Sequence, residues 1–315
     1  MMQDVAKELQ IATGAFSFDN KLIQVLDLCM APGGFTAYSL YENPMGVIDA
    51  FSLPEAEGGH PVLALKHDKR VRVHFTDITM WPEELGVDNV PDNHPDISNF
   101  CSGWPCSCRA YDLVICDGQA LDTHDVAEYR KRTEQTRLIN SQLVLGLQRI
   151  KAGGTLIVLL HRLYKWRCVK LLYTFSCFSD IQLFKHKRYH AVKPSFYLVA
   201  RNVQSKTEMA IQAINTFRDS WCRATFGTDQ GEEEHNELDA NELIPILAKF
   251  GPTFIELARP AWAIQAAALK QASWMRKDGT AEETGEEKAY QNGLSVNKDL
   301  AKTNTASESS IAKKL

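Results

Sequence analysis

The segment Val25-Leu-Asp-Leu-Cys-Met-Ala-Pro-Gly-Gly-Phe35 decides the fold, because it joins an apolar strand to a helix through a glycine turn. Glycine lets backbone approach a ligand closely, and ligands bind at the carboxyl ends of strands in open α/β sheets. The dinucleotide fingerprint Gly-x-Gly-x-x-Gly is absent, so a ligand with a cationic amino-acid group is favoured over a diphosphate. The same turn also serves as a plain strand-to-helix connection in α/β proteins, so both interpretations stand at this point.

Around this segment, short apolar runs alternate with amphipathic stretches. They predict an α/β fold with strands at 23–28, 46–51, 71–75, 111–116, 155–160, 181–185 and 195–200. Helical spacing of leucines predicts a helix over 126–150. The Pro-, Asn- and Asp-rich segment 86–109 predicts a long inserted loop, and such loops are usually functional or disordered.

The composition divides the chain into three parts. Residues 1–204 carry the strand pattern, and 205–277 are rich in Ala, Leu and Gln without a strand signal, which predicts a helical extension. Residues 278–315 contain a single aromatic residue, Tyr290, and many Glu, Lys, Ser and Thr. Such a segment buries too little apolar surface to offset the entropy of ordering, so it is predicted to be a disordered tail.

The overall composition is that of an ordinary globular protein: 315 residues, 44% hydrophobic, with a net charge of −4. This charge argues against a surface that binds nucleic acid throughout, although a local basic face is compatible with it. The sequence has no apolar run long enough for a membrane span and no secretory leader pattern, and several of its cysteines, such as Cys29 and Cys116, lie in apolar segments as buried thiols would. A cytoplasmic or nuclear location is therefore predicted.

The segment from Asp27 to Phe35 resembles the first motif of the FtsJ-like family of S-adenosylmethionine-dependent RNA ribose 2′-O-methyltransferases. Further motifs follow in the family's order: Phe75-Thr-Asp77, the strand 111–116 with Asp117, and Gly153-Gly-Thr-Leu-Ile-Val. The resemblance covers about 20–203 at family level. It implies a seven-stranded Rossmann-like class I methyltransferase sheet, followed here by the helical extension, with S-adenosylmethionine as cofactor.

The resemblance also implies site residues. Gly33 and Gly34 would pass under the methionine part of the cofactor, Asp77 would bind the adenine amino group, and Asp117 would face the methyl as the catalytic residue. A helix cap is an equally good interpretation of Asp77 taken alone. The implied cofactor-binding set is Asp27, Cys29, Ala31, Pro32, Gly33, Gly34, Phe35, Asp77 and Asp117.

The catalytic pattern departs from the family's Lys-Asp-Lys-Glu tetrad. Leu159 and Ser195 occupy the positions expected for the second lysine and the glutamate, and only Lys7 lies in the region of the first. His161 or Lys193 could substitute, unless both are solvated residues at strand ends. Moreover, the acid of the strand 46–51, Asp49, comes earlier than the usual ribose-binding position.

Basic and aromatic residues are interleaved in two segments near the predicted strand ends. Cations bind phosphate and exposed rings stack on unpaired bases, so RNA is the predicted partner, whereas a solvated basic loop is the alternative. The predicted substrate-binding residues are Lys165, Arg167, Lys187, Arg188 and Lys193. The cysteines 101, 106 and 108, with His94 upstream, lack ordinary zinc-site spacing, so no metal is predicted.

Three functions follow from these patterns. The first is a methyltransferase that uses S-adenosylmethionine and acts on RNA ribose hydroxyls. The second is a catalytically inactive RNA-binding or scaffolding protein that keeps the fold, which Leu159 and Ser195 favour. The third is a methyltransferase for a small molecule or a protein, where a ribose tetrad is not needed. The helical extension could act as a lid or as a surface for a protein partner.

Overall fold

The computed structural model describes residues 1–20, 22–106, 109–120, 126–227 and 240–272. The predicted tail at 278–315 lies outside these residues. The chain divides into two units, Met1–Ala268 and Leu269–Leu315, and the fold below is that of the first. No helix among the described residues is both long and apolar enough to cross a membrane.

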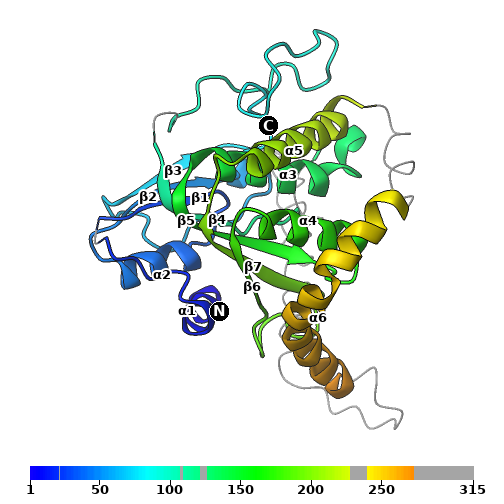
Figure 1. The fold of residues 1–315 in the computed structure, drawn as a ribbon. Coiled ribbons are helices and arrows are strands. Elements are labelled where there is room, and N and C mark those ends of the chain that lie inside the picture. The colour runs from blue at the N-terminus through cyan, green and yellow to red at the C-terminus, as the bar shows by residue number, and fades with distance from the viewer. Residues whose placement is uncertain (21, 107–108, 121–125, 228–239, 273–315) are drawn as a thin grey trace, which may run out of the picture. The chain divides into compact units, whose positions relative to one another are not determined.

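The described elements alternate between helices and strands over most of the first unit (Figure 1). In chain order they are α1 (Met2–Thr13), β1 (Gln24–Asp27), α2 (Gly34–Glu42), β2 (Val47–Ser52), η1 (Glu55–Glu57), β3 (Val71–Phe75), β4 (Tyr111–Cys116), η2 (Glu128–Arg130), α3 (Glu134–Arg149), β5 (Ile150–His161), α4 (Trp166–Ser176), β6 (Asp180–Phe184), β7 (Ser195–Val203), α5 (Glu208–Phe226) and α6 (Ala240–Gln271). Each predicted strand is present.

The strands form one seven-stranded sheet in the order β3-β2-β1-β4-β5-β7-β6. The strands β1 to β5 pair in parallel, whereas β7 runs antiparallel to both β5 and β6. The order reverses between β1 and β4, so the chain leaves these two strands in opposite directions along the sheet. A crevice forms at the carboxyl ends of the strands at such a switch point, and this positions the site.

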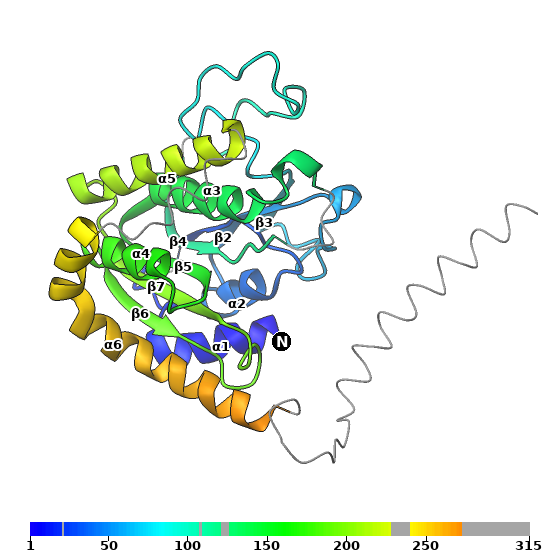
Figure 2. The ribbon, with the colours of Figure 1, turned by 90° about the vertical axis from the view of Figure 1, so that its right-hand side faces the viewer.

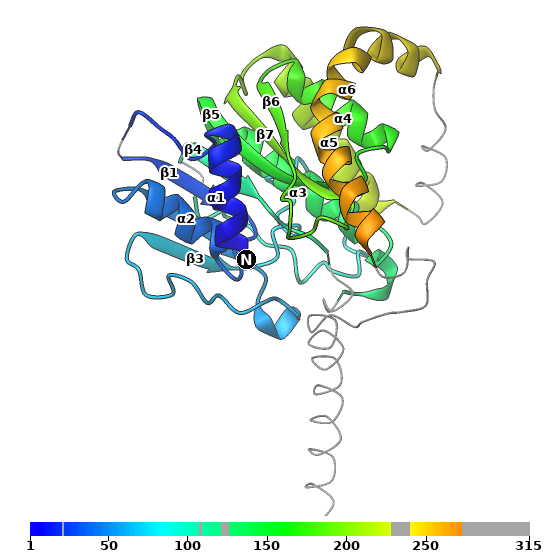
Figure 3. The same ribbon diagram turned by 90° about the horizontal axis from the view of Figure 1, so that it is seen from below.

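Two apolar layers cover the sheet because successive strand residues point to opposite faces. Leu113 and Ile157 pack with α1 and α2, whereas Val114 and Leu156 pack with α3, α4 and α5. Figures 2 and 3 show the helices α1 and α2 on one face of the sheet and α3 and α5 on the other. This arrangement confirms the predicted α/β class.

Two predicted segments differ in detail from the structure. The helix predicted over 126–150 begins only at Glu134, since the short helix η2 and a turn precede it. The inserted loop at 86–109 is irregular as predicted and extends outward (Figures 1 and 2), but its described part is held to the domain at a few buried residues. Its Trp104 stacks on Phe51 with ring centroids 4.4 Å apart, and its His94 hydrogen-bonds the carbonyl of Thr225 at 3.1 Å.

The helical extension packs on the α/β domain through buried aromatic and small residues. Phe250 and Phe254 of α6 belong to the same apolar cluster as the helix α4, and Gln265 donates a hydrogen bond to the carbonyl of Val192 at 3.2 Å. Outward-facing Ile244 and Ile255 remain exposed on α6. The lid and the partner surface therefore both stay predictions.

Candidate active site

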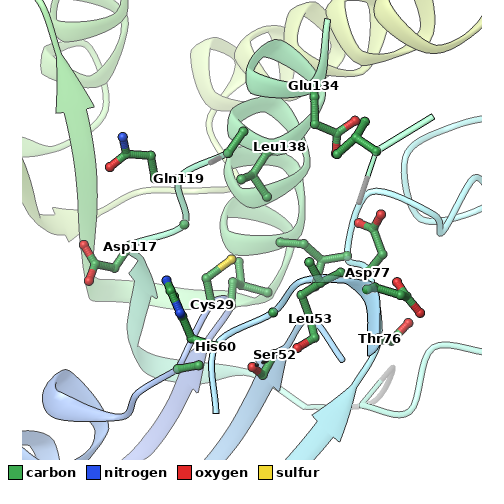
Figure 4. A pocket seen from close by; sticks show the side chains of 18 of the residues that line it. Cys29, Ser52, Leu53, His60, Thr76, Asp77, Asp117, Gln119, Glu134 and Leu138 are labelled. Atoms are coloured by element: carbon green, nitrogen blue, oxygen red, sulfur yellow. Dashed lines mark hydrogen bonds between the residues drawn. The ribbon is translucent and has the colours of Figure 1, made fainter. Parts of the chain in front are cut away.

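A pocket opens at the switch point between β1 and β4 and encloses about 990 Å³ including its mouth, which suits a small organic ligand. Figure 4 shows Asp117 and Asp77 at opposite sides of this pocket, with Glu134 and Leu138 entering from α3. The loop after β2 supplies the remaining wall, including Leu53 and His60. The pocket therefore presents a carboxylate at each end of a largely apolar floor.

The predicted cofactor-binding residues fall into two groups. Cys29, Ala31, Asp77 and Asp117 line the pocket. The other five, Asp27, Pro32, Gly33, Gly34 and Phe35, form the turn behind it and do not line it. These five shape the loop from β1 to α2, and the ring of Phe35 packs into the core against Tyr197.

Asp27 is buried beneath the turn. Its carboxylate accepts a hydrogen bond from the hydroxyl of Thr36 at 2.6 Å, and burial raises its pKa to about 6. Gly33 directly after the turn has φ of 102°, in the left-handed region that favours glycine. The backbone of Pro32 accepts hydrogen bonds from the amides of Leu63 and Ala64, which ties the turn to the loop after β2.

Asp77 follows β3 at the far side of the pocket. One carboxylate oxygen accepts hydrogen bonds from the amide and hydroxyl of Thr79, both at 2.8 Å, so Asp77 caps a turn and not a helix. The other oxygen lies 3.6 Å from the guanidinium of Arg130. Arg130 in turn lies 3.7 Å from Asp96 of the inserted loop, which connects this loop to the pocket.

Asp117 follows β4 at the near side of the pocket. Its carboxylate accepts a hydrogen bond from the hydroxyl of Tyr197 in β7 at 2.9 Å. Burial raises the pKa of Asp117, the hydrogen bond from Tyr197 lowers it and the nearby carboxyl of Asp27 raises it, with a net result of about 8. A cationic group placed in the pocket would offset this penalty, which is the expected property of a sulfonium site.

The remaining tetrad positions surround Asp117 with groups of a different chemistry. Leu159 is buried in the apolar cluster beneath α1, and Ser195 is buried with no hydrogen-bond partner for its hydroxyl among the described residues. Lys7 is exposed on α1. His161 is partly buried, unlike a solvated strand-end residue, whereas Lys193 is exposed.

The predicted substrate-binding residues, Lys165, Arg167, Lys187, Arg188 and Lys193, are all exposed. Lys165 and Arg167 lie directly before and in the first turn of α4, after β5, and the other three lie in the loop between β6 and β7. Antiparallel pairing of β5 with β7 brings both segments to one end of the sheet. Acidic residues also approach this surface from α1: Glu8 lies 3.3 Å from His186, and Asp4 accepts a hydrogen bond from Tyr189.

Lys185 belongs to the same basic segment but is buried. Its ammonium donates hydrogen bonds to the carbonyls of His190, Lys193 and Ser195, at 3.1, 2.6 and 2.7 Å. Burial lowers its pKa to about 8. Lys185 therefore holds the loop between β6 and β7 in shape.

Asp49, the acidic residue of β2, has a structural role. Asp49 is 2% exposed and is paired with the guanidinium groups of Arg72 and Arg109 at 2.9 and 2.7 Å, while Tyr111 donates a hydrogen bond to it at 2.9 Å. Ser52, not Asp49, reaches the pocket from this strand. The early position of Asp49 in the sequence thus reflects an ion pair between strands.

Asp49 also belongs to a group of three potential metal ligands with His74 and Cys106, whose ligand atoms lie within 4.8 Å of one another. The two guanidinium groups on the same carboxylate would repel a divalent cation, so this group does not fit a metal. Cys101 lies beside Thr76 instead of joining this group, and Cys108 is outside the described residues.

We expect Asp49→Ala to lower the free energy of unfolding by about 3 kcal/mol, because the arginines and Tyr111 lose a buried partner. Urea denaturation followed by circular dichroism measures this. Glu128→Gln is the matched control, since Glu128 forms an exposed ion pair with Lys131 and its loss should leave the midpoint unchanged. Equal midpoints for the two variants would contradict the structural role of Asp49.

Several pocket residues carry no signal in the sequence. Glu57, His60, Arg130 and Glu134 line the pocket from segments without a recognisable motif. Tyr197 could have been found from its strand, because it shares a face with the residue two positions before it, Ser195. Its pairing partner Asp117 is 80 residues away, and only the sheet brings the two together.

The strand order, with its antiparallel seventh strand and a pocket at the switch point, defines a class I methyltransferase. The chain belongs to the FtsJ-like methyltransferase family, whose model matches residues 6–203. S-adenosylmethionine is the cofactor of the protein, and it supplies an electrophilic methyl group. The residues present fit this cofactor, since Asp117 offers a buried carboxylate to its cation and Asp77 lies at the opposite side.

Similar solved structures include the fibrillarin/Nop5p complex (13% identity, TM-score 0.40, 64% of this chain and 83% of that chain). They also include an rRNA methylase from Streptococcus thermophilus (11%, 0.34, 64% and 94%). A third is human methyltransferase-like protein 13 in complex with SAH (11%, 0.35, 78% and 95%). No curated protein matches the chain by sequence.

Proposed function

We propose that the protein transfers the methyl group of S-adenosylmethionine to a ribose 2′-hydroxyl of RNA. One observation carries this proposal: Asp117 lies at the pocket end of β4, and on the same side of the sheet β5 ends and β7 begins next to segments that carry exposed basic residues. A phosphate backbone held by these loops would place its ribose near the end of the pocket where Asp117 lies.

The residues around Asp117 would divide the work of transfer. Asp117 favours a cation at its end of the pocket, and Tyr197 fixes the orientation of its carboxylate by a hydrogen bond of 2.9 Å. The exposed cations Lys165, Lys187 and Lys193 would neutralise phosphates of the acceptor strand. A hydroxyl is a weak nucleophile, so a base is also required.

A second candidate function is supported by a specific observation. Leu159 and Ser195 leave the tetrad without its second lysine and its glutamate, and Leu159 is buried among apolar side chains. A protein that binds the cofactor and RNA without transfer would have the same features. The two functions differ in one measurable product, the methylated acceptor.

The test combines calorimetric titration of S-adenosylmethionine with transfer of labelled methyl to pools of cellular RNA, protein and metabolites. The proposed function predicts cofactor binding and label in RNA nucleosides that carry the methyl on the 2′-oxygen. Binding without label in any pool would support the inactive protein, and label confined to protein or metabolites would place the acceptor in another class.

We expect the triple variant Lys165→Ala/Arg167→Ala/Lys193→Ala to weaken binding of single-stranded RNA. Each lost phosphate contact should reduce the slope of log affinity against log salt by about 0.7. Lys206→Ala is a matched control, since Lys206 is equally exposed but follows the opposite end of β7. Fluorescence anisotropy over a salt series measures the slope, and an unchanged slope in the triple variant would exclude this surface as the RNA site.

A further inference from the structure

We propose that His161 is the general base that accepts the proton of the acceptor hydroxyl, in the place of the lysine that the family carries on the same strand. This inference rests on the proposed function and names a catalytic residue for it. As the O–CH₃ bond forms and the S–CH₃ bond of the cofactor breaks, the hydroxyl proton passes to a ring nitrogen of His161. The products are S-adenosylhomocysteine, the methylated ribose and an imidazolium that returns its proton to water.

The register of the sheet places His161 beside the site. Leu159 pairs with Tyr197, and His161 pairs with Ser195, between the antiparallel strands β5 and β7. Alternate strand residues share a face, so His161 points to the same face as Leu159, the residue in the lysine position. His161 lies two residues beyond Leu159, about 7 Å along the strand. A ribose bound beside the Asp117–Tyr197 pair would be large enough to reach His161 across this distance.

Two polar side-chain atoms where β5 ends and β7 begins lack hydrogen-bond partners within the described part of the chain. The Nε2 atom of His161 and the hydroxyl of Ser195 are both buried and have no hydrogen-bond partner among the described residues. Buried polar atoms are nearly always satisfied in folded proteins. Two such atoms without a partner, on residues that pair directly across the two strands, therefore indicate a site that can bind another polar group.

The charges around His161 keep its imidazole neutral and able to accept a proton. Burial lowers the pKa of His161, and the cations of Arg162, His190, Lys185 and Lys193 lower it further. These groups come from the end of β5 and from the loop between β6 and β7. An acidic residue of α1 also approaches this loop: the carboxylate of Glu8 lies 3.3 Å from the ring of His186.

Two other titratable groups near this strand pair, Lys185 and Asp117, are poorer bases. All three protons of the Lys185 ammonium are occupied by backbone carbonyls. Asp117, with a pKa of about 8, holds a proton at neutral pH unless a cation is bound beside it. When Asp117 is ionised, its carboxylate is paired with that cation. His161 is then the group on β5 that can accept the proton of the hydroxyl.

The backbone directly after His161 is held in an uncommon conformation. Arg162 has φ of 56°, a left-handed value that non-glycine residues seldom adopt, and its amide donates a hydrogen bond to the carbonyl of Pro194 at 2.9 Å. Such backbone strain clusters at functional sites. The bond to Pro194 anchors the end of β5 to the start of β7 and so fixes the position of His161.

The test compares His161→Gln, which cannot accept the proton, with His190→Asn, which alters the same basic cluster and tolerates the left-handed backbone of residue 190. We expect His161→Gln to reduce methyl transfer to RNA by about 100- to 1000-fold. Calorimetric affinity for S-adenosylmethionine should stay unchanged, because His161 does not line the pocket. His190→Asn should keep most of the wild-type rate, and added imidazole should restore part of the rate to His161→Gly.

Two further readouts separate catalysis from structure. The wild-type rate should increase with pH along a limb whose apparent pKa lies below that of free histidine, and this limb should vanish in His161→Gln. In the cofactor-free protein, an NMR titration should show the His161 ring losing its proton at the same low pH. A His161→Gln rate close to wild type, or a His161 ring that titrates like free histidine, would overturn the inference and leave the proposed function intact. Wild-type protein that binds the cofactor but methylates no RNA would overturn both.

Discussion

Asp117→Asn is expected to reduce methyl transfer to RNA by about 100- to 1000-fold while making the cofactor-free protein more stable. Asparagine keeps the shape of the side chain and can still accept the hydrogen bond from Tyr197. It removes the negative charge that would lie beside the sulfonium. The same substitution removes the cost of burying a carboxylate, so activity and stability should move in opposite directions.

The pH dependence of this effect follows from linkage. The folded protein holds the Asp117 proton up to about pH 8, whereas the unfolded chain, in which the carboxyl has its ordinary pKa of 3.8, releases the proton near that pH. The stability contributed by this group is therefore full at low pH and is lost as pH rises through about 8. At pH 8.5 we expect Asp117→Asn to gain on the order of 2 kcal/mol, or about 4–8 °C in melting temperature. At pH 4 the two proteins should melt together.

A pair of ligands provides the control for the Asp117 prediction. S-adenosylmethionine carries a positive sulfonium and S-adenosylhomocysteine does not, so only the first should bind more tightly as pH rises through the pKa of Asp117. In Asp117→Asn this pH dependence should disappear, while affinity for S-adenosylhomocysteine stays near that of wild type. Calorimetry at several pH values measures both, and equal pH dependence for the two ligands would refute the assignment of Asp117 to the methyl end of the pocket.

Gly33→Val is expected to weaken binding of S-adenosylmethionine by more than about 100-fold, which corresponds to about 3 kcal/mol. Gly33 has φ of 102°, and a Cβ atom there would lie 2.9 Å from the Cβ of Ala64 and 3.2 Å from the Cε of Met30. The turn must move to relieve these contacts. Ala31 belongs to this turn and lines the pocket, so a movement of the turn changes the shape of the cofactor site directly.

The control for Gly33 must carry the same backbone strain without the contacts. Gly103 has φ of 71°, and a Cβ atom there would meet nothing within 4 Å. Gly103→Val should therefore destabilise the protein modestly and leave cofactor affinity intact. Calorimetry on samples with equal folded fraction by circular dichroism distinguishes the two, and a Gly33→Val affinity equal to that of Gly103→Val would show that the turn does not shape the cofactor site.

Much of the fold could be predicted because its signals are local. Apolar runs identified each strand, and the glycine turn after Asp27 identified the start of α2. The boundaries of α3 were less predictable, since residues before Glu134 continue the amphipathic pattern but form η2 and a turn. The inserted loop was recognisable as irregular, yet its packing through Trp104 depends on an aromatic partner, Phe51, far away in the chain.

The candidate site was predictable only in part. Cys29, Ala31, Asp77 and Asp117 line the pocket as the motifs indicated, because each lies in a segment that leaves the carboxyl end of a parallel strand. Asp27 belongs to the same motif but lies beneath the turn, where Thr36 binds its carboxylate. The motif describes the whole turn and does not distinguish a residue that faces the ligand from one that supports it.

The sequence by itself determined the class of fold, the family and the position of the cofactor turn, since these depend on periodicity and short contiguous motifs. Tertiary structure alone decided that the hydroxyl of Tyr197 binds Asp117, that Leu159 pairs with Tyr197, and that the Nε2 of His161 is buried with no partner among the described residues. The physical reason is that antiparallel register between β5 and β7 sets which side chains share a face and how deeply each is buried. Burial and nearby charge then set the protonation state of each group. Both depend on contacts between residues that are far apart in the sequence, so the sequence does not reveal them.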